Sequence, residues 1–278
     1  FEIKSINGQK VSIVQSLAKW KRLRLKEFDI EPGNGILTDM RAIRPDEVLS
    51  PIHSVYVDQW DWEKRILPEQ RVLCYLKATV ESIYEAIKAT ENDLCVFYPD
   101  MTQMLPDKIH FIHAEELLKM FPHQNPKQRE EKIAQKYGAV FIIGIGANLS
   151  NGEPHDGRAP DYDDWSTLNE DGYLGLNGDI ILWYPVLQTA FEISSMGIRV
   201  DKEALERQLK IKGCADRKKL LFHSMLLNSE LPYSIGGGIG QSRLCMFFLK
   251  KSHIGEVQSG IWPDAVRKQS ESAGIRLL

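Results

Sequence analysis

Two apolar segments follow each other closely in the second half of the sequence, Ile180 to Leu187 and Phe191 to Ile198. Tyr184-Pro185 interrupts the apolar run between them, and a proline has no backbone N–H to donate to a neighbouring strand. Short apolar runs that are separated by a turn predict two strands. The pattern therefore favours a fold that is built around an antiparallel sheet.

The rest of the chain alternates between further strands and helices. Strands are predicted at 36–43, 53–62, 109–113 and 139–146, and a hairpin is predicted at the start of the chain. Helices are predicted at 16–28, 71–90, 114–121, 126–137, 201–211 and 216–227, and Asp201 is the expected N-cap of one of them. No repeat or linker divides the sequence. We therefore expect one α+β domain over residues 1–278.

Charge and cysteine content limit the partners and the compartment. The chain has 35 Lys and Arg against 38 Asp and Glu, a formal charge of -3, so it has no overall basic excess to bind a nucleic-acid backbone. Its four cysteines are scattered, with neither metal-ligand nor disulfide spacing. The longest apolar runs are far shorter than the roughly 18 residues that span a bilayer. We expect a cytoplasmic protein with no nucleic-acid and no membrane partner.

Two acidic residues interrupt the apolar strands. If the strands pair about Pro185 and Val186, Asp179 and Glu192 are symmetric about the turn and lie opposite each other. Two facing carboxylates repel unless a cation lies between them. Because Mg²⁺ takes one or two carboxylates together with phosphate oxygens, this pair predicts a site for the magnesium of Mg·ATP. The alternative is a pair of solvent-exposed acids.

A glycine-rich segment and an arginine are further candidates. Gly236 to Gly240 holds four glycines in five positions and precedes a helical segment that contains Arg243. Backbone N–H groups there can come close to a phosphate or a base, although a flexible turn is an equally good interpretation. Arg44 ends a predicted strand, where its guanidinium can bind a carboxylate and a phosphate together. Taken alone, it is better interpreted as a surface arginine.

Longer blocks of sequence carry a family resemblance. Segments that resemble the second motif, the acidic metal strand and the third motif of class II aminoacyl-tRNA synthetases are Arg44-Pro-Asp-Glu47, Glu192-Ile-Ser-Ser-Met-Gly-Ile-Arg199 and Gly238-Ile-Gly-Gln-Ser-Arg243. Blocks that are similar to ammonia-dependent asparagine synthetases, the aspartate–ammonia ligases, are Ser16-Leu-Ala-Lys-Trp-Lys-Arg22, His53-Ser-Val-Tyr-Val-Asp-Gln-Trp-Asp-Trp-Glu63, Arg158-Ala-Pro-Asp-Tyr-Asp-Asp-Trp-Ser-Thr167 and Gly236-Gly-Gly-Ile-Gly-Gln-Ser-Arg243. Together they cover nearly the whole chain.

The resemblance implies a fold and a reaction. The fold is a class II synthetase-like antiparallel sheet flanked by helices, in a homodimer without an anticodon-binding domain, and residues 1–278 would be one catalytic domain. In the reaction, the side-chain carboxylate of L-aspartate attacks the α-phosphorus of Mg·ATP to give β-aspartyl-AMP and pyrophosphate. Ammonia then displaces AMP to give L-asparagine. No glutaminase module with a cysteine nucleophile is visible near the start, so free ammonia is the expected nitrogen donor.

The resemblance also assigns residues to two sides of a site. Aspartate-side positions correspond to Lys21, Arg44, Gln59, Asp61, Arg158 and Asp163. Nucleotide-side positions correspond to Ser54, Val57, Asp179, Ser194, Arg199, Gly238 and Arg243. We expect Arg44, Lys21 and Asp163 to be catalytic, with Arg44 bridging the reacting carboxylate and the α-phosphate. Gln59, Asp61 and Asp163 are expected to face the ammonium of the substrate or the incoming ammonia. Asp179 and Glu192 are the expected Mg²⁺ ligands.

One departure and two alternatives accompany this assignment. The family begins with a segment that contains the first class II motif and an aspartate of the amino-acid site, and neither precedes Phe1. We therefore expect further residues upstream. The main alternative is a regulatory relative that binds amino acid and nucleotide without making asparagine. A tRNA synthetase would need an added tRNA-binding domain and a basic surface, and the sequence shows neither.

Overall fold

The two apolar segments near residue 185 form neighbouring antiparallel strands. In the computed structural model, which describes residues 2–278, they are β7 (Asn177–Tyr184) and β8 (Thr189–Ile198). All but one residue of β7 is buried, and the chain turns between the two strands at residues 185–188. A β-bulge between Ile180 and Ile181 shifts the register, so that Asp179 pairs with Ser195 while Ile181 pairs with Glu192. The predicted hairpin is confirmed, but its predicted register is wrong.

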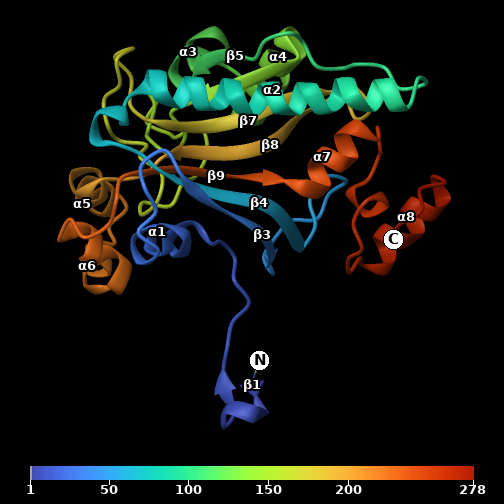
Figure 1. Cartoon of the computed structure of the whole chain (residues 1–278). Coiled ribbons are helices and arrows are strands. Elements are labelled where there is room, and N and C mark those ends of the chain that lie inside the picture. The colour runs from blue at the N-terminus through green and yellow to red at the C-terminus, as the bar shows by residue number, and fades with distance from the viewer. Residues whose placement is uncertain (1) are drawn as a thin grey trace. The chain divides into compact units, whose positions relative to one another are not determined.

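The hairpin lies inside a larger sheet (Figure 1). Within residues 2–278 the order of its seven strands is β3-β4-β9-β8-β7-β6-β5. The other strands are β3 (Gly35–Ile43), β4 (Tyr56–Arg65), β5 (His110–His113), β6 (Ala139–Ile143) and β9 (Ser234–Gly240). β6, β7, β8 and β9 pair antiparallel, as predicted, whereas β5 and β6 are parallel. Two helices connect β5 to β6, and a parallel pair needs such a crossover.

Eight helices accompany the strands within residues 2–278, which confirms the α+β class. They are α1 (Ala18–Glu27), α2 (Leu73–Phe97), α3 (Ala114–Met120), α4 (Pro126–Tyr137), α5 (Lys202–Ile211), α6 (Leu221–Leu227), α7 (Gln241–Phe248) and α8 (Asp264–Ser272). Short 3₁₀ turns are η1 (Lys4–Ile6), η2 (Pro68–Gln70), η3 (Ala215–Lys219) and η4 (Ile254–Glu256), and the opening hairpin is β1 (Glu2–Ile3) with β2 (Gln9–Lys10). Over residues 2–278, no helix is both long and apolar enough to cross a membrane.

Several predicted elements differ from the structure. β4 begins and ends three residues later than the predicted strand 53–62, and β6 ends at Ile143 and not at residue 146. α2 continues to Phe97 instead of ending near residue 90. The predicted helix 216–227 is divided into η3 and α6, because the backbone of Leu220 is extended between them. The glycine-rich segment is not a turn or loop but the strand β9. A side chain at Gly237 would collide with Met196 on the neighbouring strand, so glycine permits the close pairing of β9 with β8.

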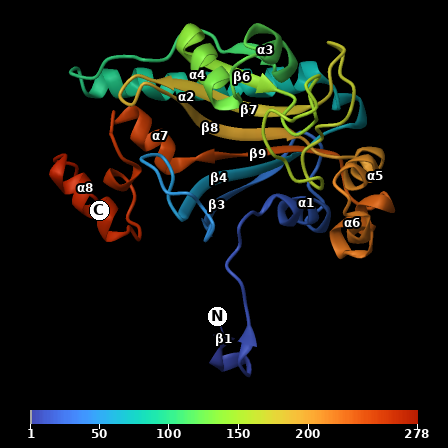
Figure 2. The same ribbon diagram turned by 180° about the vertical axis from the view of Figure 1, so that it is seen from behind.

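The chain divides into two compact units, and the boundary passes through β3, β4 and β9. Unit 1 comprises residues 2–17, 38–61 and 240–278, and unit 2 comprises residues 18–37 and 62–239. In unit 2, one apolar core lies between α3, α4 and β6, and a second lies between α5 and α6. Figures 1 and 2 both show α5 and α6 together at one end of the strands, with α1 beside them.

Candidate active site

Arg158 lies at the centre of a buried group of polar side chains in unit 2. It belongs to the long loop between β6 and β7, and its side chain is 10% exposed. Its Nη2 donates to Asp179 on β7 and to Ser195 Oγ on β8, the latter over 2.6 Å, and its Nε lies 3.6 Å from Asp163 Oδ2. The bulge in the β7–β8 pair puts Asp179 directly opposite Ser195, so one guanidinium group can reach both.

Arg199 forms a second buried ionic group directly after β8. Its Nε and Nη2 donate to the Glu63 carboxylate over 2.8–3.1 Å, and its Nη1 donates to Asp163. Ser234 Oγ donates to Glu63 as well, over 2.6 Å. Arg199, Glu63 and Asp163 are at most 3% exposed. Asp163 therefore lies beside both arginines and connects the two groups.

The buried acids respond differently to these surroundings. Burial would raise the pKa of Glu63, but the charge and hydrogen bonds of Arg199 outweigh it, so this pKa is below its usual value. Burial raises the pKa of Asp163, with Arg199 and Arg158 opposing the shift and the negative charge of Glu63 adding to it. Burial also raises the pKa of Asp179, to about 7, with Glu192 acting in the same direction and Arg158 opposing it.

Three glycines leave space for these side chains. A Cβ at Gly146 would lie 2.7 Å from Cβ of Arg158, and one at Gly197 would lie 3.1 Å from Asp163 Oδ1. A Cβ at Gly236 would overlap Glu63 and come within 2.5 Å of Arg199. The glycine-rich strand β9 thus has a use that the sequence prediction did not include: it makes room for a buried ion pair.

The prediction that Asp179 and Glu192 lie opposite each other is wrong. They are on neighbouring antiparallel strands, but the bulge places Glu192 against Ile181, two pairs further along. Since paired residues share a face of the sheet, Asp179 and Glu192 are diagonal neighbours on one face. Glu192 is exposed and Asp179 is 6% exposed. Among residues 2–278, no group of three or more His, Cys, Asp or Glu has the arrangement of a complete metal site.

The other unit 2 candidates are placed as follows. Lys21 on α1 is fully buried, and its charge helps to lower the pKa of Glu63. Ser194 on β8 is 1% exposed, and its Oγ has no hydrogen-bond partner among the described residues. Gly238 on β9 pairs with Ser195. These three residues are therefore in or next to the strands that carry the ionic groups.

Arg44 belongs to unit 1 and is much more exposed. It follows β3 directly, and its backbone N–H donates to the carbonyl of Val55 over 2.8 Å. Its side chain is 44% exposed and forms an ion pair with Glu47 over 3.9 Å. The arrangement keeps the backbone of Arg44 fixed while the guanidinium group remains open to solvent.

A hydrogen-bonded cluster in unit 1 anchors the start of α7. Asp58 on β4 accepts from the backbone N–H and the Oγ of Ser242, over 3.1 and 2.6 Å. Gln258 donates to Ser242 Oγ over 3.0 Å and accepts from Ser54 Oγ over 2.6 Å. Through Gln258, the candidate Ser54 thus helps to fix the first turn of α7, which carries Arg243. On the same strand as Asp58, Val57 and Gln59 are half-buried and Asp61 is 5% exposed.

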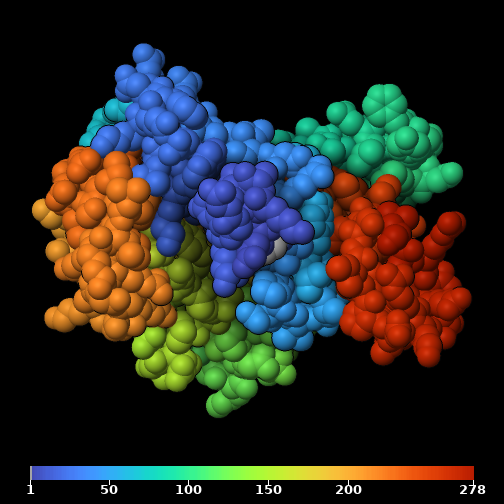
Figure 3. Space-filling view, turned by 90° about the horizontal axis from the view of Figure 1, so that it is seen from below, coloured from blue at the N-terminus to red at the C-terminus, as the bar shows by residue number. Residues whose placement is uncertain are grey.

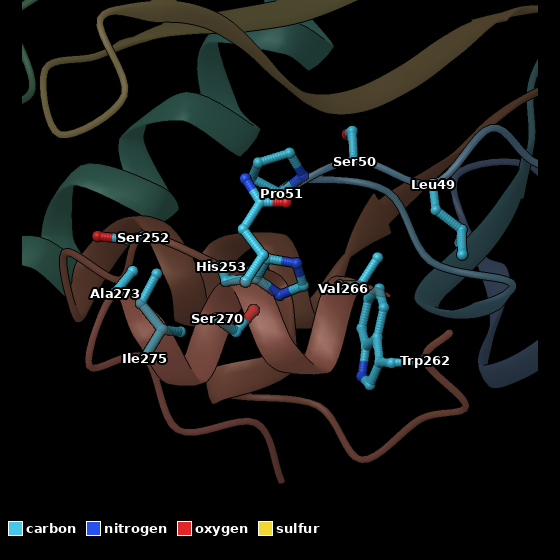
Figure 4. A pocket seen from close by; sticks show the side chains of 11 residues that line it. Leu49, Ser50, Pro51, Ser252, His253, Trp262, Val266, Ser270, Ala273 and Ile275 are labelled. Atoms are coloured by element: carbon cyan, nitrogen blue, oxygen red, sulfur yellow. The ribbon is translucent and has the colours of Figure 1, made fainter. Parts of the chain in front are cut away.

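Unit 1 also contains a pocket of about 260 Å³ beneath α8 (Figure 4). Pro51, His253, Trp262, Val266 and Ile275 are among the residues that line it. His253 Nδ1 accepts from the backbone N–H of Gly255 over 3.0 Å, so the ring is engaged in local structure. None of the predicted site residues lines this pocket, and we do not assign it to the site.

Sequence reasoning missed several residues of these networks, among them Glu63, Asp58 and Gln208, which binds the loop that carries Arg158. Glu63 could have been found, because it continues the alternation of Gln59 and Asp61 along β4. Asp58 lies on the opposite face of β4, so the alternation does not point to it. Gln208 is a polar residue on the buried face of α5, next to Leu205 and Leu209, and only the tertiary structure shows what it binds.

Comparison with known proteins agrees with the fold and identifies the family. A family model described as aspartate-ammonia ligase matches residues 1–274. Proteins named aspartate–ammonia ligase from Parabacteroides distasonis and Bacteroides thetaiotaomicron are 57% and 55% identical to this chain, over all of it and 81% of their own length.

Solved class II synthetases share the fold. Asparaginyl-tRNA synthetase from Pyrococcus horikoshii, complexed with asparaginyl-adenylate, has a TM-score of 0.68 at 14% identity, over 95% of this chain and 60% of its own. The Entamoeba histolytica asparaginyl-tRNA synthetase has a TM-score of 0.63 at 15% identity, over 93% and 57%. At such identity only the fold is shown, which confirms the predicted class II synthetase-like core. By the family model and these close relatives, the chain belongs to the aspartate–ammonia ligase family.

Proposed function

We propose that this chain uses ATP to make L-asparagine from L-aspartate and ammonia, through β-aspartyl-AMP, with release of pyrophosphate and AMP. Membership of the family supports the overall reaction. The solved neighbour with asparaginyl-adenylate supports an acyl-adenylate on this fold. Adenylation requires little covalent catalysis by the protein and depends mainly on charged groups positioned around the phosphate. A site of this kind should therefore consist mainly of fixed charged groups.

The observation that carries the proposal is the buried pair of arginines, Arg158 and Arg199, which meet at Asp163. Each guanidinium group is held between carboxylates, so neither needs to reorganise when substrate charge develops. We assign Arg158, Asp163 and Lys21 to the aspartate side. Asp179, Ser194, Arg199 and Gly238 are assigned to the nucleotide side.

Residues of unit 1 complete the assignment. Arg44 is proposed to contact the reacting carboxylate and the α-phosphate, because its guanidinium group is accessible to solvent and can bind both anions. Gln59 and Asp61 are proposed to face the substrate ammonium or ammonia. Ser54, Val57 and Arg243 are assigned to the nucleotide. We treat residues 1–278 as one catalytic domain that acts as a homodimer in the cytoplasm.

Magnesium is proposed to enter with ATP. Asp179 and Glu192 share one face of the sheet, and Glu192 raises the pKa of Asp179, so the two charges repel and a divalent cation would relieve the repulsion. When bound, the ion would neutralise phosphate charge. The residues of this chain would hold it through Asp179 and Glu192 while Arg158 orients Asp179.

The test is exchange of labelled pyrophosphate into ATP. We expect exchange that depends on aspartate and needs neither ammonia nor tRNA. With ammonium added, AMP and asparagine should form in equal amounts. ADP in place of AMP would contradict the adenylate route. Binding of aspartate and ATP without exchange would instead favour the regulatory relative.

A further inference from the structure

The loop that carries Arg158 and Asp163 has little regular structure of its own. Between residues 158 and 167 it forms no helix or strand. Its backbone makes an isolated bridge from Asp163 to Arg199, and it forms hydrogen bonds from Tyr162 and Asp164 to residues 198–200 and from Asp164 and Thr167 to residues 175–176. Loops of this kind are mobile unless side chains elsewhere fix them. Figure 3 shows the yellow-green loop between β6 and β7 next to the orange helices α5 and α6.

Gln208 on α5 makes four hydrogen bonds to this loop. Its Nε2 donates to the carbonyls of Pro160 and Asp163 over 2.9 and 3.0 Å. Its Oε1 accepts from the backbone N–H of Trp165 over 2.9 Å and from Ser166 Oγ over 3.0 Å. A side-chain amide has two N–H donors and two acceptor lone pairs, so its capacity is fully used. Gln208 is completely buried.

The four partners surround Asp163 in sequence. One lies three residues before it, one is its own carbonyl, and two follow it closely. A reversed amide would set Oε1 against two carbonyl oxygens, so the orientation is determined by the partners themselves. The carboxylate of Asp163 then extends from a backbone that is held on both sides.

α5 is itself well anchored. Asp201 caps it by accepting from the N–H of Ala204 over 2.8 Å, and Leu205 and Leu209 are completely buried in the α5–α6 core. Arg71 connects Asp201 to Asp164 of the loop, over 2.9 and 2.7 Å. The helix is therefore a rigid support for whatever Gln208 holds.

We propose that Gln208 is a positioning residue for the aspartate side of the site: it fixes the backbone around Asp163 so that the Asp163 carboxylate lies against Arg158 and Arg199. This inference rests on the function proposed above. Gln208 does not touch the reacting atoms. Its loss should therefore weaken aspartate binding much more than ATP binding.

The first test is Gln208→Met, which keeps the side-chain length and removes all four hydrogen bonds. We expect the KM for aspartate in pyrophosphate exchange to rise about tenfold or more, since buried carbonyls and N–H groups lose their partners and the loop loosens. The KM for ATP should change less than about twofold. If Gln208 only filled the core, an apolar side chain of similar length would leave both KM values unchanged, and that result would overturn the proposal.

Gln208→Glu is the second variant. It retains an acceptor for Trp165 and Ser166 but sets a carboxylate oxygen against two carbonyls, so it should raise the aspartate KM as well. Leu209→Ala is the matched control, because Leu209 is the adjacent, equally buried residue of α5. It should lower the melting temperature and leave the aspartate KM unchanged. An equal rise in the aspartate KM for Leu209→Ala would show a general effect of α5 instability and refute a specific role.

One further measurement and one milder variant distinguish failure of this inference from failure of the proposed function. Calorimetric titration with aspartate measures binding without turnover, and Gln208→Asn offers a milder change if the larger ones do not fold. Wild-type protein that neither binds aspartate nor catalyses exchange would overturn the proposed function together with this inference. An active wild type with unchanged aspartate affinity in the Gln208 variants would overturn this inference alone.

Discussion

Two arginines that the sequence assigns to one reaction have different surroundings. Arg199 in unit 2 has a side chain that is 4% exposed and binds two carboxylates, whereas Arg44 in unit 1 is 44% exposed and pairs with Glu47 over 3.9 Å. A buried charge needs partners and an exposed ion pair contributes little to stability. The difference separates an arginine that holds two buried carboxylates from one whose guanidinium group is open to solvent, and mutations can test that separation.

The largest effect on stability is expected for Arg199→Met. The change leaves Glu63 and Asp163 buried without their shared cation, and removal of one partner from a buried ion pair costs roughly 3–5 kcal/mol. The free energy of unfolding, measured with urea, should fall by about that amount. Glu63→Gln should lower the free energy of unfolding by less, since Arg199 keeps its ion pair with Asp163. A loss below about 1 kcal/mol for Arg199→Met would remove the contrast between the two arginines.

Arg44→Ala should give the opposite pattern. Turnover in pyrophosphate exchange should fall by roughly 10²- to 10³-fold, because a charge placed at the developing transition state is lost. The urea midpoint should stay unchanged, since the side chain is 44% exposed and its ion pair with Glu47 is 3.9 Å long. Arg41→Ala is the control: Arg41 lies on β3, just before Arg44, is 69% exposed and has no assigned role. A folded Arg44 variant with near-normal turnover would refute the role of Arg44.

The same contrast explains what could be predicted from sequence. Local patterns were sufficient for the hairpin at 180–198, for the Asp201 cap and for α4, because hydrophobic spacing and capping act over a few residues. The register of β7 and β8 was wrong because a bulge is a tertiary feature that no short pattern reports. Of the candidate site, the structure brings the side chains of Arg158, Asp163, Asp179 and Arg199 into contact, while their assignment to aspartate and nucleotide stays a prediction. Glu63 could have been found from the alternation along β4, whereas Gln208 belongs to the distant helix α5 and could not be connected with these residues beforehand.

A smaller effect is expected for the acids that are proposed to hold magnesium. Mg·ATP should raise the melting temperature of the wild type by mass action, and Asp179→Asn and Glu192→Gln should each reduce that shift. A tenfold loss of affinity corresponds to about 1.4 kcal/mol of ligand stabilisation. Without ligand, Glu192→Gln should be as stable as the wild type or slightly more stable, because it removes a repulsion from Asp179. Equal shifts in all three proteins would exclude the proposed magnesium site.

The smallest expected effect is on the pH dependence of stability. It compares a buried histidine, His113, with an exposed one. His113 ends β5, is 6% exposed, and its Nδ1 accepts from the N–H of Glu115 over 3.0 Å. The proton is therefore on Nε2, which donates to the carbonyl of Leu174 over 2.9 Å. A second proton would face the N–H of Glu115, and burial already disfavours the charged ring, so the pKa of His113 is below its usual value.

The unfolded chain thus binds this proton more readily than the folded chain does, and the stabilisation from neutral His113 is present above about pH 6.5 and lost as the pH falls below it. One proton can contribute at most about 1.4 kcal/mol per pH unit. Urea unfolding between pH 7.5 and 5.5 should show a smaller decrease for His113→Gln than for the wild type. His123→Gln, which changes an exposed histidine, should behave like the wild type. If His113→Gln and the wild type lose stability in parallel over this range, His113 does not stabilise the fold through its neutral form, because the acid sensitivity then arises elsewhere in the chain.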